Sequence, residues 1–150
     1  MTYDRVVVDT NVLLSAALSP KNLPAQLVDR LLLASGQLVF SERTYAEFEA
    51  RIWRPKFDRY LTLERRRAIL LHIHAHAHWV EIPVSMVEHQ FSCDGDDDAF
   101  IHVALTGNLT RLISGDSDLL CLHPLNELHI LTPRQAWDEL EGLSAMTNMA

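Results

Sequence analysis

The stretch Val6-Val7-Val8-Asp9-Thr10-Asn11 decides the fold of this chain. Three consecutive β-branched apolar residues are typical of a strand that is buried on both faces, as in a parallel sheet. The strand ends directly at Asp9, and a helical pattern begins after it. Ligands of open α/β sheets lie beyond the carboxyl ends of the strands, so this position suits a functional carboxylate. Asp9 also suits the N-cap of the following helix, and the stretch alone leaves both roles open.

Outward from this strand, helical and strand patterns alternate along the chain. Turn residues and caps separate them. We expect helices at residues 11–17, 23–34, 41–53, 62–76, 97–107 and 132–140, and further strands at residues 38–40, 79–83, 111–113 and 128–131. This order predicts an α/β fold, a three-layer α/β/α sandwich with a mostly parallel sheet of four or five strands. Residues 1–141 are expected to form one domain, followed by a frayed tail over residues 142–150.

The composition is that of a soluble globular protein. The chain has 150 residues, of which 48% are hydrophobic and 22% charged. No apolar run approaches the roughly 20 residues that span a bilayer, and the first residues do not resemble a signal peptide. The two cysteines, Cys93 and Cys121, suit free thiols in a reducing cytosol. We therefore expect a cytoplasmic protein without membrane association.

The charged residues are distributed unevenly. The formal net charge of −7 argues against a nucleic-acid partner. However, eight of the 13 basic residues fall in one window, namely Arg43, Arg51, Arg54, Lys56, Arg59, Arg65, Arg66 and Arg67. From residue 94 onward there are ten acidic residues and only two arginines. The basic window suits phosphate contacts and the later part a cluster of carboxylates, although a solvated helix face is the favoured explanation when the basic window is taken alone.

Four histidines, His72, His74, His76 and His78, alternate with apolar residues. In a strand they would share one face and form a surface for zinc or nickel. In a helix they would separate into the pairs 72/76 and 74/78 on different faces. The leucines and alanines before them favour the helix. We therefore expect solvated histidines rather than a metal site.

Acidic residues stand at the ends of several predicted elements. Asp9 follows the first strand, Glu47 lies in the helix after the second strand, and two further pairs are Asp97 with Asp98 and Asp116 with Asp118. Each alone has an ordinary explanation, such as a favourable charge at a helix N-terminus or an ion pair between Glu47 and Arg51. Carboxylates that converge need a cation among them, and an all-oxygen cluster suits Mg²⁺ or Mn²⁺.

Other designs for phosphate chemistry do not fit. The five glycines form neither a dinucleotide fingerprint nor a phosphate-binding loop. A phosphoaspartyl enzyme generally uses a lysine late in the chain, whereas Lys21 and Lys56 are the only lysines here. Serine and cysteine hydrolase signatures are absent.

Four segments in order resemble the motifs of PIN domains, the ribonuclease fold of many toxins from prokaryotic toxin–antitoxin systems. The segments are residues 7–16 with Asp9, 41–48 with Glu47, 94–101 with Asp97 and Asp98, and 112–120 with Asp116. Residues 54–57 and 131–133 also resemble the subgroup of toxin components in this family. The resemblance covers residue 3 to about residue 140.

The resemblance implies a set of metal-binding residues. These are Asp9, Glu47, Asp98 and Asp116, with Asp97 and Asp118 as additional acids. Asp98 is preferred to Asp97 because the apolar residues after it fit the spacing of the family better. Asn11 and Ser114 would be supporting polar groups, and Ser114 stands where the family commonly has threonine.

The resemblance also implies an activity and partners. The chain would be an endoribonuclease that uses Mg²⁺ or Mn²⁺ to hydrolyse RNA, and the toxin of a toxin–antitoxin pair. A cognate antitoxin would thread a peptide over the acidic cleft, and the domain would form a homodimer. Two alternatives are a PIN-like module that binds RNA or protein without catalysis, and a nuclease of related fold that acts on DNA.

Overall fold

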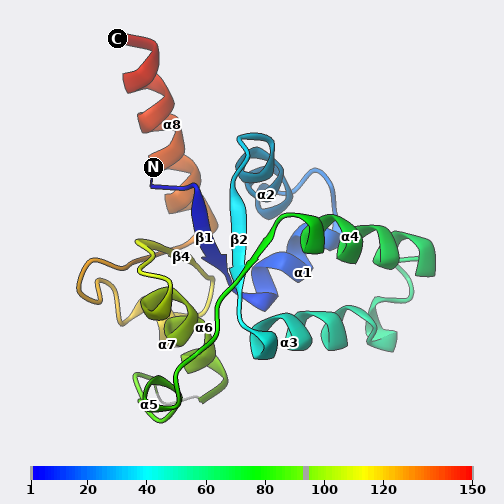
Figure 1. Cartoon of the computed structure of the whole chain (residues 1–150). Coiled ribbons are helices and arrows are strands. Elements are labelled where there is room, and N and C mark those ends of the chain that lie inside the picture. The colour runs from blue at the N-terminus through cyan, green and yellow to red at the C-terminus, as the bar shows by residue number, and fades with distance from the viewer. Residues whose placement is uncertain (1, 93–94, 150) are drawn as a thin grey trace.

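A five-stranded parallel sheet lies at the centre of the computed structural model, with helices on both of its faces (Figure 1). The structure describes residues 2–92 and 95–149, with side chains as far as Met146. The strands are β1 (Arg5–Val8), β2 (Gln37–Phe40), β3 (Ala77–Trp79), β4 (Arg111–Ile113) and β5 (His129–Leu131). Their order across the sheet is β3-β2-β1-β4-β5. The predicted α/β fold with a parallel sheet is therefore confirmed.

Helices connect the strands and cover the sheet. The longer helices are α1 (Thr10–Leu18), α2 (Leu23–Leu33), α3 (Glu42–Ile52), α4 (Leu63–Ala75), α6 (Gly95–Thr106) and α8 (Pro133–Met149). Three short helices are η1 (Pro55–Phe57), α5 (Val84–Val87) and α7 (Ser117–Leu120). None of the helices in the described residues is long and apolar enough to cross a membrane.

Side chains that alternate between the two faces of the sheet divide the core into two halves. Val6 and Val8 of β1 pack into the larger half, together with α1, α2, α3, α4 and α8. Val7 points to the opposite face, where α6 and α7 cover it. Successive side chains of a strand point to opposite faces, so a run of three valines serves two cores at once. The layers are therefore helix, sheet and helix, as expected.

The β2–β3 connection differs from the sequence-based prediction. The strand expected at residues 79–83 lies at Ala77–Trp79 instead, and the helix before it ends at Ala75 with His76 as its C-cap. Pairing with β2 fixes the position, since Leu38 is opposite Ala77 and Phe40 opposite Trp79. The strand ends at Trp79 because its partner β2 ends at Phe40, and beyond this pair the N–H of Val80 donates to the carbonyl oxygen of Phe40 at 2.9 Å.

The four histidines therefore lie neither all in one strand nor all in one helix. His72 and His74 belong to α4, His76 caps it, and His78 lies in β3. The rings of His72 and His76 lie 4.7 Å apart between centroids, whereas His74 contacts Tyr45 and Trp79. Among the described residues, the histidines form no group of three potential metal ligands.

Helix α8 is longer than expected. It continues past residue 140 to Met149. A single glycine at position 142 costs only about 1 kcal/mol in a helix and does not end it. Arg30 of α2 also holds this part of the helix, since its guanidinium donates to Glu141 Oε1 at 2.7 Å and to Ser144 Oγ at 2.8 Å. The expected fraying of residues 142–150 stays a prediction. Cys121 is a free thiol, while Cys93 and Asp94 lie outside the described residues.

Candidate metal centre

The topology of the sheet places a switch point between the carboxyl ends of β1 and β4. After β1 the chain builds β2 and β3 on one side, and it then returns to build β4 and β5 on the other side. The connections that follow β1 and β4 therefore lead away from each other. Open α/β sheets bind their ligands at such a point. Val8 is paired with Ile113, so the residues that follow, Asp9 and Ser114, leave the sheet side by side.

Asp9 is held rigidly at this edge. Its carboxylate accepts a hydrogen bond from the backbone N–H of Val12 at 2.9 Å, so it is also the N-cap of α1. The Ser114 hydroxyl donates to the second oxygen, Asp9 Oδ2. The same hydroxyl accepts from the backbone N–H of Asp116 at 2.9 Å. Ser114 therefore links Asp9 to the loop that carries Asp116.

Burial makes Asp9 electrostatically unusual. The residue is only 4% exposed, and this desolvation raises the pKa of its carboxyl above the ordinary value. The hydrogen bonds from Ser114 and Val12 act in the opposite direction, and the carboxylates of Asp116 and Glu47 raise the pKa further. Asp9 and Asp116 thus belong to one electrostatic site, and a cation beside them would favour their charged forms.

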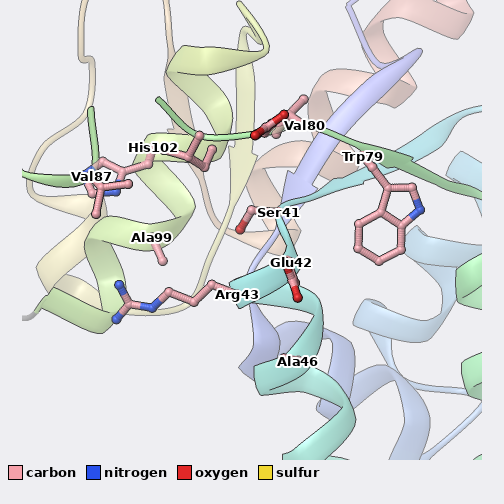
Figure 2. A pocket seen from close by; sticks show the side chains of 11 residues that line it. Ser41, Glu42, Arg43, Ala46, Trp79, Val80, Val87, Ala99 and His102 are labelled. Carbon is pink, nitrogen blue, oxygen red and sulfur yellow. The ribbon is translucent and has the colours of Figure 1, made fainter. Parts of the chain in front are cut away.

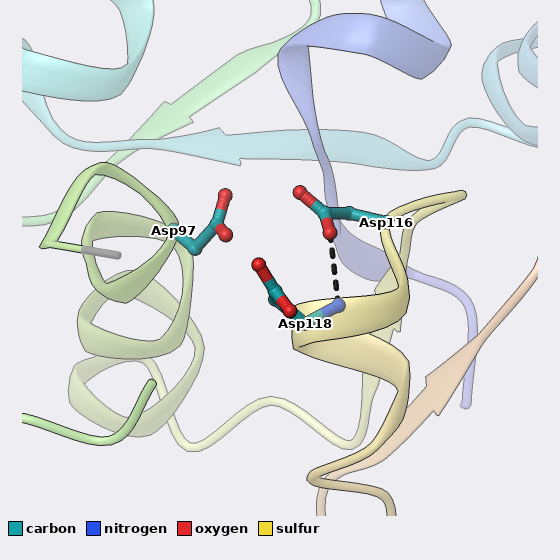
Figure 3. A group of neighbouring side chains, drawn as sticks. All are labelled: Asp97, Asp116 and Asp118. Atoms are coloured by element: carbon teal, nitrogen blue, oxygen red, sulfur yellow. Dashed lines mark hydrogen bonds between the residues drawn. The ribbon is translucent and has the colours of Figure 1, made fainter. Parts of the chain in front are cut away.

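Three further carboxylates converge next to Asp9. One oxygen each of Asp97, Asp116 and Asp118 lies within 4.8 Å of the others (Figure 3). Asp97 comes from the first turn of α6, Asp116 caps α7, and Asp118 lies in its first turn. Asp116 accepts from the backbone N–H of Asp118 at 2.9 Å. Two separate helix N-termini therefore hold the three acids together, where negative charge is favoured.

The cluster has the chemistry of a site for a hard divalent cation. Two unit charges 4.8 Å apart repel by about 3 kcal/mol at an effective dielectric constant of about 20, less where water screens them. A divalent ion would turn that repulsion into attraction. Carboxylate oxygens without nitrogen or sulfur ligands are what Mg²⁺ and Mn²⁺ prefer. The residues present thus fit such an ion.

Glu47 lies at the outer side of this site. Its Oε2 accepts from the Thr10 hydroxyl at 3.3 Å, and its Oε1 forms an ion pair with Arg51 at 2.7 Å. Arg51 also donates to Asn11 Oδ1 at 3.2 Å. The predicted i,i+4 pair of Glu47 with Arg51 is therefore present, and it does not exclude a role at the site, because Glu47 still affects the pKa of Asp9.

Asp98 has a different environment from Asp97. It is 4% exposed, and its Oδ1 accepts from the backbone N–H groups of Phe91 and Ser92 at 3.2 and 2.8 Å. The Ser92 hydroxyl donates to the same oxygen at 2.9 Å. Asp98 therefore anchors the segment before α6, while Asp97 faces the acid cluster. The geometry favours Asp97 over Asp98 as the ligand, in contrast to the preference drawn from motif spacing.

The structure thus brings together most of the acids that the sequence singled out. Asp97, Asp116 and Asp118 form the cluster, Asp9 is linked to it through Ser114, and Glu47 borders it. Sequence reasoning missed the roles of Thr10 and Ser92. Thr10 follows Asp9 directly, which was a usable signal, but nothing in the sequence around Ser92 indicates its contact with Asp98.

A family comparison agrees with this geometry. Residues 5–118 match the model of the PIN domain. The chain belongs to the PIN domain family. The matched region contains all six acids considered above. The PIN-domain protein is also similar to the uncharacterised protein MJ1680 of Methanocaldococcus jannaschii, with 29% identity over 146 residues that cover 91% of this chain and 92% of that protein.

Two solved structures share the fold of this PIN domain. One is the structure of VapBC2 from Rickettsia felis bound to a DNA fragment from their promoter, with a TM-score of 0.57 and 11% identity. The match covers 85% of this chain and 98% of that one. The other is Mycobacterium tuberculosis VapC20, a toxin that cleaves the sarcin–ricin loop, with a TM-score of 0.53 and 11% identity over 83% of this chain and 98% of that one. At this level of identity the likeness concerns the fold.

Proposed function

We propose that this PIN domain is a metal-dependent endoribonuclease that hydrolyses phosphodiester bonds of RNA. The observation that carries the proposal is the convergence of Asp97, Asp116 and Asp118 at the β1/β4 switch point, next to the buried Asp9. Membership of the PIN family and the fold shared with VapC20, a toxin that cleaves the sarcin–ricin loop, support it.

In this proposal, Asp97, Asp116 and Asp118 hold Mg²⁺ or Mn²⁺ together with Asp9. Such an ion supplies an activated water and neutralises charge on the reacting phosphate. The chain itself fixes the positions of its ligands. Ser114 orients the Asp9 carboxylate, and the backbone N–H of Asp118 orients Asp116. Side chains held in this way need no rearrangement during the reaction, which favours catalysis by electrostatic preorganisation.

Glu47 and Arg51 complete the site on its outer side. Thr10 and Arg51 hold Glu47 where its charge raises the pKa of Asp9, so Glu47 would add a further carboxylate beside a bound metal ion. Arg51 lies at the rim of the acidic site and suits a substrate phosphate, since a guanidinium binds phosphate in a bidentate manner. Further exposed cations follow α3 along the chain, namely Arg54, Lys56, Arg59, Arg65 and Arg67. They would bind the RNA backbone and offset the net negative charge.

We further propose that the protein acts in the cytoplasm as the toxin of a toxin–antitoxin pair and forms a homodimer. The fold shared with VapBC2 and VapC20 supports the toxin role. A cognate antitoxin would then control the enzyme by covering the acidic cleft.

The test is cleavage of matched single-stranded RNA and DNA with Mn²⁺, with Mg²⁺ and with EDTA. We expect cleavage of RNA that depends on the metal, and a loss of about 100-fold or more in Asp116→Asn, because the loss of one metal ligand removes transition-state stabilisation of several kcal/mol. Asp138→Asn on α8 removes the same charge from an exposed position and serves as the control. RNA cleavage by Asp116→Asn at the wild-type rate would contradict the proposal. Cleavage of DNA alone would favour a DNA nuclease, and metal binding without cleavage a binding module.

A further inference from the structure

A groove with a volume of about 840 Å³ lies between α3 and α6, outside the acid cluster. Its walls come from the start of α3, the segment after β3, α5 and α6 (Figure 2). We call it the α3/α6 groove. Most of its lining is apolar, and the residues that matter here are Ala46, Trp79, Val80, Ile82, Val87 and Ala99. Asp97, Asp116 and Asp118 do not line it, so the groove is a separate feature of the surface.

The apolar side of the groove is exposed to an unusual degree. Helix α5 buries none of its residues. Of the residues that line the groove, Val87 is 51% exposed and Trp79 43%. Apolar side chains that gather at a groove and stay exposed mark a surface that another molecule covers. The volume is also within the range of sites that bury several side chains of a ligand.

The charges at the rim distinguish between possible occupants. Glu42 and Glu81 are exposed and line the groove, whereas its arginine, Arg43, forms an ion pair of 2.9 Å with Asp96. A negatively charged rim of this kind repels the phosphates of a nucleic acid. It also disfavours a second copy of the chain, which would bring the same carboxylates and a net charge of −7. It attracts a cationic partner.

We infer that the α3/α6 groove binds a segment of another protein in which apolar side chains are flanked by lysine or arginine. The apolar side chains would enter between Val87 and Trp79, and the basic residues would lie against Glu42 and Glu81. Recognition of an amphipathic segment by a groove commonly works in this way, with affinity from the apolar anchors and orientation from the charges. The inference does not depend on nuclease activity or on whether the partner is an antitoxin.

The experiment uses two fluorescent peptides that share a spacing of leucines suited to one helical face. One peptide has lysine flanks and the other has glutamate flanks. Fluorescence anisotropy with the full chain would measure their affinities. We expect the lysine peptide to bind about tenfold or more tightly than its glutamate twin, and to bind more weakly as salt rises.

Variants then localise the binding. Val87→Asp should weaken the lysine peptide about tenfold, and the double variant Glu42→Gln/Glu81→Gln should weaken it at least about threefold. Leu71→Asp is the matched control, because Leu71 is 74% exposed on α4 and does not line the groove. Circular dichroism would verify that each variant is folded.

Several outcomes would overturn the inference. They are absence of binding, equal binding of the glutamate peptide, or equal effects of Val87→Asp and Leu71→Asp. Displacement of the peptide by a short RNA would indicate a nucleic-acid site instead. A dimer that Val87→Asp dissociates, measured by light scattering, would indicate self-association. A chain that cleaves no RNA but binds the lysine peptide through Val87 would retract the proposed function and leave this inference standing.

Discussion

Asp9 illustrates how one residue serves both structure and site. Its carboxylate caps α1 through the N–H of Val12 and accepts a second hydrogen bond from Ser114. The two roles considered for Asp9 from the sequence are therefore compatible, because a carboxylate has two oxygens with several acceptor positions. Burial is unfavourable for its charge, and neighbouring acids increase that effect. The metal-free protein should thus be less stable when Asp9 is ionised.

The pH dependence of stability tests this conclusion. The pKa of Asp9 is raised in the folded state, so the folded protein binds this proton more tightly than the unfolded chain. Its contribution to stability is fully present below the unfolded pKa and is lost as the pH rises through the folded pKa. In EDTA, Asp9→Asn should therefore be more stable than the wild type at pH 7, with the difference disappearing towards pH values below about 4.

Urea unfolding at several pH values would measure this difference. Asp138→Asn, at an exposed position on α8, is the control and should show no such trend. A wild type that stays as stable as Asp9→Asn throughout would show that burial of Asp9 has no energetic cost.

The neighbours Asp97 and Asp98 should respond differently to substitution. Asp98→Ala removes the acceptor of two backbone N–H groups and should lower the free energy of unfolding by about 2 kcal/mol. Asp97→Ala should change it by no more than about 0.5 kcal/mol in EDTA, because it relieves repulsion from Asp116 and Asp118. With Mn²⁺ at 100 times its Kd, the wild type should gain about 2.7 kcal/mol and Asp97→Ala much less.

Urea titrations with and without Mn²⁺ would separate the two residues. If instead Asp98→Ala loses the stabilisation by Mn²⁺ and Asp97→Ala keeps it, the motif-based preference for Asp98 is right and the assignment from geometry is wrong.

At the scale of elements, helix N-termini organise the site. Helices α1, α6 and α7 all begin at the carboxyl edge of the sheet, and each carries an acid in or beside its first turn. Helix α3 begins there as well, with Ser41 as N-cap and Thr44 completing a capping box. This cap sets the start of the helix, and with it the position of Glu47 one and a half turns later.

Removing the cap of α3 should therefore destabilise the protein. In the wild type the backbone N–H of Thr44 donates to Ser41 Oγ at 3.2 Å. Ser41→Ala removes this acceptor, and we expect a loss of about 1 kcal/mol in the free energy of unfolding. Ser85→Ala, at an exposed position of α5, should have no comparable effect. Urea unfolding of both variants measures the difference, and equal stabilities would show that the capping box contributes nothing.

The elements that the sequence predicted well are those whose signals are local. The caps at Ser41 and Thr132 indicated where α3 and α8 begin, and the valines indicated β1. The predicted position of β3 was wrong because it depends on residues that are distant in the sequence, namely on the register against Leu38 and Phe40 of the adjacent strand β2. The short helices α5 and α7 were not predicted, since four residues give too little periodicity to detect.

Across the whole molecule, a polar cluster joins the two ends of the chain at the edge of the sheet opposite the acids. Tyr3 donates to Glu139 Oε1 at 2.8 Å, and Arg111 binds both oxygens of Glu139 at 2.7 and 3.1 Å. The residues come from the start of β1, the start of β4 and α8. Burial and the Glu139 carboxylate raise the pKa of the Tyr3 hydroxyl, while hydrogen bonds from Arg111 and Tyr3 leave the pKa of Glu139 lowered despite its partial burial.

Glu139→Gln should weaken this link. The amide retains one acceptor but loses the charge and the bidentate contact with Arg111, so we expect a loss of about 1 kcal/mol in the free energy of unfolding. Because the cluster lies at the opposite edge from the acids, the stabilisation by Mn²⁺ should not change. Asp138→Asn, at an exposed position of the same helix, is the control for loss of charge. A change in Mn²⁺ affinity in Glu139→Gln would show that the two edges of the sheet are coupled.

The sequence by itself determined the class of fold and the order of the longer elements, and it singled out the acids that we propose as metal ligands. These follow from hydrophobic periodicity, from caps and from motifs, all of which are local. Only the tertiary structure decided which acids meet, that Asp97 faces the cluster while Asp98 binds Phe91 and Ser92, and where β3 lies. Adjacent residues on a helix differ by about 100° in direction, so spacing alone does not say which of two neighbours faces a partner on another element.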